Sequence, residues 1–230
     1  MLLKNRLTLL FLLFLFMLPY QFKVFSQSQK GMLMYQIENK QFKKTTFNKN
    51  NKIVNYQYIK VGKIIETKGV FSLDIKVKTY NNKGNLQNEE TSKYNCKTKE
   101  GNIFMGILPF INKPSKKIDI NVLSNNTLYP SNITTSKSIE DFKIIATYKT
   151  GLLGVNIKVY MNYKDRNIYK TKNNNYIITG IITMKVNVAG VNVSNVIYKS
   201  EEKLETSKGV VFQKFVEDSG AYFTIKLISK

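Results

Sequence analysis

The sequence of 230 residues contains no histidine, no tryptophan and a single cysteine. The absence of histidine excludes histidine-based acid–base relays, Ser–His and Cys–His nucleophile pairs and the commonest zinc ligand. A lone cysteine, Cys96, excludes an intrachain disulfide framework and a cluster of metal-binding thiolates. Because no histidine is present to activate Cys96, we expect a buried, unreactive thiol. We therefore predict no enzymatic activity, no catalytic residues, no bound metal and no cofactor.

Acidic residues are scarce as well: 36 Lys and Arg stand against 15 Asp and Glu, which gives a formal charge of +21. All but two of the basic residues are Lys, and the chain is rich in Asn and Ile, as an AT-rich coding sequence produces by default. Reading of nucleic-acid bases favours Arg, whose planar fork pairs with guanine. We therefore expect a solvated basic coat, with anionic envelope surfaces or envelope proteins as partners and no nucleic acid.

The amino terminus has the pattern of a secretory signal peptide. Lys4 and Arg6 precede an apolar run at residues 7–18, and a cleavage-like site precedes Gln27. The run is too short to cross a bilayer, which needs about 20 residues. We predict that residues 1–26 are removed on export and that no transmembrane span remains after processing.

Most of the remaining chain alternates between apolar and polar residues, which is typical of half-buried antiparallel strands. The clearest alternations lie at residues 71–77 and 155–163, and two more lie at 184–188 and 221–227. Further strands are predicted at residues 32–38, 53–61, 90–98, 143–149 and 210–216.

Turn signals rich in Gly and Asn separate these runs at hairpin spacing. The sequence predicts an all-β fold, an antiparallel meander of about 10–14 strands that forms a strongly curved sheet or open barrel. One domain is predicted over residues 27–230, in two halves at about 27–106 and 140–230. Residues 107–139, rich in Pro, Asn and Ser, are predicted to connect the halves, and residues 105–111 are compatible with a short helix.

Several weakly specific segments follow one another in a set order: residues 75–86, 94–97, 101–104, 128–133 and 139–141, the hairpins around Gly154 and Gly190, and residues 207–211. Taken in this order, they resemble the TapB-like family of exported, uncharacterised β-rich proteins of Gram-negative bacteria. The chain departs from the family pattern at Ser136, just before Ser207 and at Val211. The resemblance implies export to the periplasm or cell envelope, an antiparallel β architecture and no established enzymatic activity, and it supplies no site residues.

The carboxylates offer no obvious site. Four adjacent pairs occur, and neighbours in a strand point to opposite faces, so that one pair cannot jointly hold a proton or a metal. We expect all of them to be solvated. The pairs are Glu89–Glu90, Glu140–Asp141, Glu201–Glu202 and Glu217–Asp218.

The apolar strand faces are the remaining candidates, either as an ordinary core or as a surface that shelters a lipid or another apolar ligand. The first functional hypothesis is a periplasmic or cell-envelope binding module for an apolar or amphipathic ligand. The alternative is a structural or assembly protein of the envelope that acts through protein–protein contacts. The candidate ligand face consists of Phe71, Leu73, Ile75, Val77, Val155, Ile157, Val159 and Met161.

Overall fold

The structure is a computed structural model, and it describes residues 33–96, 102–110, 117–124, 128–129, 137–150, 154–171, 175–205 and 208–229. The predicted signal peptide at residues 1–26 lies outside the described residues. The described residues form three short helical segments, which are η1 (Leu33–Gln36), α2 (Ile103–Ile107) and η2 (Leu108–Phe110). Their strands are β1 (Gln41–Phe47), β2 (Ile53–Val61), β3 (Ile65–Thr67), β4 (Val70–Asn81), β5 (Leu86–Cys96), β6 (Lys117–Val122), β7 (Lys137–Ile139), β8 (Phe142–Thr150), β9 (Val155–Lys170), β10 (Asn175–Val188), β11 (Val191–Glu205), β12 (Gly209–Glu217) and β13 (Tyr222–Ser229).

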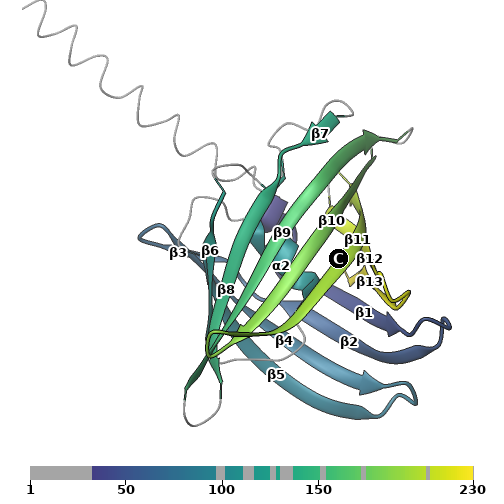
Figure 1. Cartoon of the computed structure of the whole chain (residues 1–230), viewed down its shortest axis with the longest axis horizontal. Coiled ribbons are helices and arrows are strands. Elements are labelled where there is room, and N and C mark those ends of the chain that lie inside the picture. The colour runs from purple at the N-terminus through teal and green to yellow at the C-terminus, as the bar shows by residue number, and fades with distance from the viewer. Residues whose placement is uncertain are drawn as a thin grey trace, which may run out of the picture.

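Eleven of the strands close into a barrel (Figure 1). The order around the barrel is β10-β11-β12-β13-β1-β2-β4-β5-β6-β8-β9, and β9 pairs with β10 to complete the ring. β3 extends the β4 edge and β7 extends the β9 edge. All pairings are antiparallel except β5–β6, which is parallel. The all-β prediction is therefore confirmed, and the curvature continues until the sheet closes on itself.

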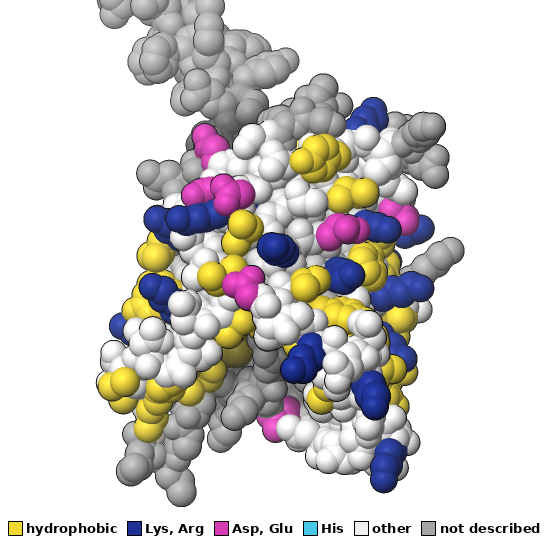
Figure 2. All heavy atoms as spheres, turned by 45° about the vertical axis from the view of Figure 1, so that its right-hand side comes forward, with side chains coloured by type: hydrophobic (Ala, Val, Ile, Leu, Met, Phe, Trp, Pro, Cys, Tyr) yellow, Lys and Arg dark blue, Asp and Glu magenta, His cyan; other side chains and the backbone are white. Residues whose placement is uncertain are grey.

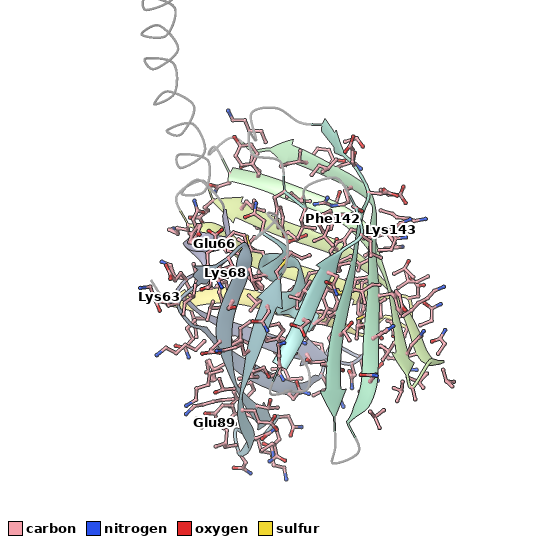
Figure 3. The ribbon with its side chains drawn as sticks, turned by 90° about the vertical axis from the view of Figure 1, so that its left-hand side faces the viewer. Lys63, Glu66, Lys68, Glu89, Phe142 and Lys143 are labelled. Carbon is pink, nitrogen blue, oxygen red and sulfur yellow. The ribbon has the colours of Figure 1, made fainter. Side chains whose placement is uncertain are left out.

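The two-residue periodicity separates the interior of the barrel from its outer wall. On β4, Phe71, Leu73, Ile75 and Val77 are buried, whereas Lys76 points outward. Successive side chains of β8 show the same rule in Figure 3, where buried Phe142 and exposed Lys143 leave the strand in opposite directions. Lysines are spread over the outer wall in Figure 2, as expected for a solvated basic coat.

Five hairpin turns lie at the same end of the barrel, which we call the hairpin end. They connect β1 to β2, β4 to β5, β8 to β9, β10 to β11 and β12 to β13. The opposite end carries β3, β7, η1 and the connections from β9 to β10 and from β11 to β12. This difference matters because the interior is filled differently at the two ends.

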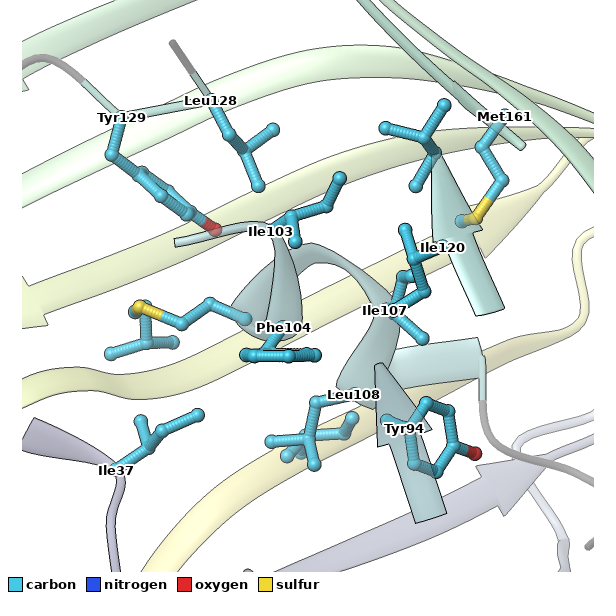
Figure 4. Packing of buried hydrophobic residues seen from close by; sticks show 14 of the residues in the cluster. Ile37, Tyr94, Ile103, Phe104, Ile107, Leu108, Ile120, Leu128, Tyr129 and Met161 are labelled. Atoms are coloured by element: carbon cyan, nitrogen blue, oxygen red, sulfur yellow. The ribbon is translucent and has the colours of Figure 1, made fainter. Parts of the chain in front are cut away.

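The segment α2–η2 plugs the barrel from inside. All five residues of α2 are buried, as are the first two residues of η2. In Figure 4, Phe104 and Ile107 pack among side chains from several strands. Gly106 allows close approach, since a Cβ there would lie 2.7 Å from Leu128 Cδ2 and 3.0 Å from the Tyr163 hydroxyl. The short helix compatible with residues 105–111 therefore exists, and it lies in the core.

Polar groups fix the plug to the barrel wall. The Tyr163 hydroxyl donates a hydrogen bond of 2.8 Å to the Gly106 carbonyl oxygen. Lys44 points inward from β1, and its Nζ donates to the Pro109 carbonyl oxygen at 2.9 Å. Both carbonyl groups belong to buried residues, and hydrogen bonds stabilise buried backbone groups. The plug is thus held at both of its helical segments.

A second polar cluster lies near the opposite end and corrects one prediction. Glu202, expected to be solvated, is buried, and one of its carboxylate oxygens accepts hydrogen bonds from the Tyr129 hydroxyl at 2.6 Å and from Gln213 Nε2 at 2.7 Å. Arg166, also buried, donates to the carbonyl oxygens of Leu128 and Glu140. Burial without such partners would be costly for either charged group.

A backbone irregularity points Arg166 inward. Asp165 has a left-handed φ of 50°, and the β9–β10 register shifts between Thr179 and Ile181. Such bulges re-aim side chains. Opposite the bulge, a Cβ on Gly180 would lie 3.1 Å from Arg166 Cγ, so the arginine stem occupies the space that a larger residue would need.

The amino-terminal strand and the connection differ from prediction. Residues 33–36 form the 3-10 helix η1 instead of the strand predicted at residues 32–38, and the first strand, β1, follows it. The connection predicted at residues 107–139 contains β6 and β7. β6 pairs with β5 on one side and β8 on the other, so the connection itself joins the two halves of the barrel. Cys96 is buried on β5, as expected.

Candidate functional site

An apolar cavity of about 520 Å³ lies inside the barrel toward the hairpin end. Its volume falls in the range of roughly 300–1,000 Å³ that is usual for small-molecule sites. Strands β5, β6, β8, β9, β10 and β11 form its wall, and the plug forms its floor. The lining residues are Tyr94, Ile107, Phe110, Ile118, Ala146, Tyr148, Ile157, Val159, Met161, Met184, Val186, Val188 and Ser194.

None of the described residues that line the cavity has a charged side chain. Its polar side-chain atoms are the hydroxyl groups of Tyr94, Tyr148 and Ser194. Burial raises the pKa of the Tyr94 hydroxyl and also that of the Tyr148 hydroxyl. Both tyrosines therefore stay neutral at physiological pH and offer one donor each. An uncharged wall with a few hydroxyl groups favours a molecule that is mostly apolar and carries a small polar group.

The cavity extends to the rim of the barrel. Val188 is the last residue of β10, and the turn at residues 189–190 follows it directly. Tyr148 pairs with Ile157 close to the β8–β9 turn. Because these lining residues stand at the ends of their strands, the apolar wall continues up to the hairpin end.

The floor of the cavity is rigidly built. Phe110 of η2 packs against the rings of Tyr198, Phe215 and Phe223, with ring centroids 5.2–5.8 Å apart. Lys44 Nζ lies 4.4 Å from the centroid of the Phe223 ring while it bonds the η2 backbone. Aromatic packing and a buried hydrogen bond together fix the depth of the cavity.

The predicted ligand face is divided between this cavity and the core. Ile157, Val159 and Met161 line the cavity, and half-buried Val155, at the start of β9, lies outside its lining. The four predicted residues of β4 also lie outside the lining and are buried in the hydrophobic core, namely Phe71, Leu73, Ile75 and Val77. Of the predicted face, the cavity lining therefore contains residues of β9, and these meet residues of other strands and of the plug.

The sequence analysis missed most of the lining. Met184, Val186 and Val188 carry the same alternation as β9, and they meet it because β10 pairs with β9. Alternation identifies such residues as inward-facing, but it does not reveal which strands are neighbours. Ile107 and Phe110 could not be identified by strand alternation, because they lie in the helical segments of the plug.

A second hollow, of about 450 Å³, differs in chemistry. Its lining includes Asp165, Lys199, Glu201 and Lys214, so charges of both signs are mixed around it. Within the described part of the chain, no cluster of three or more Cys, Asp or Glu side chains is arranged to hold a metal ion. The apolar cavity is therefore the better candidate for a ligand site.

The described residues include no helix that is both long and apolar enough to span a membrane.

Comparisons with known proteins identify no family. No protein family model matches the chain, and no curated protein matches it. The resemblance to the TapB-like family therefore stays a prediction.

Two solved structures are similar over most of the chain. One, described as a putative lipoprotein of Parabacteroides distasonis, is 11% identical, with a TM-score of 0.45 over 85% of this chain and 96% of that one. The other, described as a putative exported protein with a YmcC-like fold from Bacteroides fragilis, is 12% identical, with a TM-score of 0.38 over 83% of this chain and 94% of that one. Similarities of this size do not identify a function.

Proposed function

We propose that this protein is an exported, non-enzymatic binding protein that shelters an apolar or amphipathic ligand in the barrel. The observation that carries the proposal is the uncharged lining of the cavity of about 520 Å³. An apolar wall gains free energy when an apolar molecule covers it and displaces the water against it. A lipid with one acyl chain fits this chemistry, since its chain can lie against the wall while its polar group remains near the rim.

The site of action is the periplasm or cell envelope. The basic and apolar pattern of residues 1–26 supports export. The lack of histidine in the chain supports a role without catalysis, because the usual general acid–base group is missing. The hydroxyls that line the cavity have no neighbouring base among the lining residues to activate them.

The test is binding of an apolar probe by protein from which endogenous lipid has been removed. Native mass spectrometry first records whether the purified protein carries a lipid, and titration with a fluorescent fatty acid then measures affinity. Ala146→Phe places a ring in the cavity, because Ala146 is part of its lining. Ala221→Phe is the matched control, since Ala221 is half-buried and outside the lining.

We expect Ala146→Phe to weaken probe binding at least about tenfold, because the ring occupies space that the probe needs. Ala221→Phe is expected to bind like the parent protein. Val188→Asp, at the half-buried rim, supplies a second variant that is expected to weaken binding if Ala146→Phe does not fold, as judged by circular dichroism. Failure of the delipidated parent protein to bind the probe would refute the proposal.

A further inference from the structure

The hairpin end carries apolar side chains in positions exposed to water. Val191 and Val193, beside the β10–β11 turn, are 65% and 58% exposed. Leu86 follows the β4–β5 turn, and Ile53 and Val54 follow the β1–β2 turn; all three are exposed. Val191 pairs with Val188, which lines the cavity. Exposed apolar residues therefore continue from the cavity lining onto the tips of the hairpins.

Lysines stand in the same turns. Lys49 and Lys52 lie in the β1–β2 turn and Lys83 in the β4–β5 turn, and all three are exposed. Against them, the described turns of this end carry one carboxylate, Asp218. Basic residues outnumber acidic ones in the protein as a whole, so attraction to an anionic surface does not by itself select one end. The turns of the hairpin end, however, present cations and apolar groups together.

The opposite end differs in charge and not in apolar exposure. Ile65 and Leu123 are 56% and 55% exposed there, but carboxylates are close to them in the chain or across the sheet. Glu66 directly follows Ile65 in the chain. The Leu123 N–H donates a hydrogen bond to the carbonyl oxygen of Lys143, and Asp141 lies two residues before Lys143. On the face that Figure 2 presents, most of the acidic side chains lie in the upper half. Exposed Lys63 and Lys68 flank Ile65, so charges of both signs are mixed at this end, whereas the described turns of the hairpin end carry mostly cations.

The turns at the hairpin end satisfy their own backbone groups. Asn48 Oδ1 accepts hydrogen bonds from the backbone N–H groups of Asn50 and Lys52. Asn81 Oδ1 accepts from the N–H groups of Lys83 and Asn85 in the same way. Backbone polar groups without partners are costly in an apolar medium. Turns with internal partners can reach the edge of the acyl-chain region with a smaller penalty.

We propose that the hairpin end docks on an anionic lipid bilayer. The lysines of the turns contact phosphate groups, and the exposed valines, Leu86 and Ile53 enter the boundary between headgroups and acyl chains. The rim of the cavity then faces the membrane, so that a lipid passes between bilayer and cavity without crossing water. This last step rests on the proposed function, whereas docking itself does not.

The test is flotation of the mature protein with lipid vesicles. Vesicles of phosphatidylcholine with about 30% phosphatidylglycerol are expected to bind the protein, and pure phosphatidylcholine vesicles to bind it at least about tenfold more weakly. Binding is expected to fall as salt increases, because exposed charges are screened beyond about 10 Å at 0.1 M salt. Equal binding to both vesicles would overturn the proposal.

Matched variants locate the contact. The double variant Val191→Asp, Val193→Asp is expected to weaken vesicle binding at least about tenfold. Its control, Ile65→Asp with Leu123→Asp, adds the same charge at the opposite end and is expected to change vesicle binding about twofold or less. The triple change Lys49→Glu, Lys52→Glu, Lys83→Glu is expected to abolish the preference for anionic lipid. Its control is the same change at exposed lysines elsewhere, namely Lys63, Lys68 and Lys143. Equal loss in a variant and its control would refute docking through this end.

Separate readouts distinguish docking from ligand binding. The valine variants are expected to bind a soluble fluorescent fatty acid like the parent protein, because their changed side chains lie outside the cavity lining. Ala146→Phe is expected to lose the fatty acid and keep vesicle binding. If vesicle binding fails while the fatty acid still binds, the docking proposal is wrong and the binding function stands.

Discussion

Burial of Lys44 makes the stability of this protein depend on pH. Its side chain is 3% exposed, lies against the Phe223 ring and bonds the Pro109 carbonyl oxygen. Burial lowers the pKa of Lys44 from 10.5 to about 7. In the unfolded chain the pKa returns to about 10.4. The folded protein therefore releases a proton at a pH where the unfolded chain still holds it.

The sign follows from this difference in proton binding. Below about pH 7 both states carry the proton, and stability does not change with pH through this group. Between the two pKa values the unfolded chain binds more protons, so the free energy of unfolding rises with pH. Integration from pH 7 to pH 9 gives a rise of about 2 kcal/mol from Lys44.

The assay is urea unfolding, followed by circular dichroism at pH 7, 8 and 9, for the parent protein and Lys44→Met. Methionine has a similar length and no proton to release. The difference in unfolding free energy between the two proteins cancels the other titrating groups, and it is expected to shift by about 2 kcal/mol in favour of lysine between pH 7 and 9. A difference that stays constant within about 0.5 kcal/mol over this range would show that Lys44 does not titrate as a buried amine.

Three further predictions concern the plug and the polar cluster. Gly106→Ala is expected to destabilise the protein by about 1–3 kcal/mol in urea unfolding, because the Cβ would lie 2.7 Å from Leu128 Cδ2. Tyr163→Phe leaves the Gly106 carbonyl without its donor, so a loss of about 1–3 kcal/mol is expected; no loss would show that the plug is held by packing alone. Glu202→Leu removes the acceptor shared by a buried tyrosine and a buried glutamine, and a loss of about 3 kcal/mol is expected. The neighbouring Glu201→Leu, on the exposed face of β11, is the control and is expected to change stability by about 0.5 kcal/mol or less.

Strands with regular alternation could be predicted from the sequence. The predicted strand at residues 53–61 is β2, and the prediction at 210–216 lies within β12. β1 was missed because its inward positions include Phe42 and Lys44, so a charged residue stands where an apolar one is expected. That residue faces inward because the plug offers a carbonyl acceptor, which is a tertiary contact that no local pattern encodes.

The closure of the sheet and the cavity could not be predicted for a related reason. Alternation assigns Val159 and Val186 to the inner face of their strands, but the β9–β10 pairing that brings them together is a matter of strand order. The parallel pairing of β6 with β5 depends on residues far apart in the chain. The sequence therefore predicts which side chains point inward, while the packing decides whether they contact other side chains or line the cavity.

The position of the plug determines where the cavity lies inside the barrel. Hydrogen bonds to Gly106 and Pro109 hold α2–η2 against strands on different sides of the barrel. A plug that slid toward the hairpin end would enter the cavity but would lose its hydrogen bonds to Tyr163 and Lys44. That loss opposes the gain from burying the apolar lining. The polar contacts of the plug therefore favour the position that leaves the cavity accessible, and a preformed cavity lowers the cost of ordering the site when an apolar molecule enters.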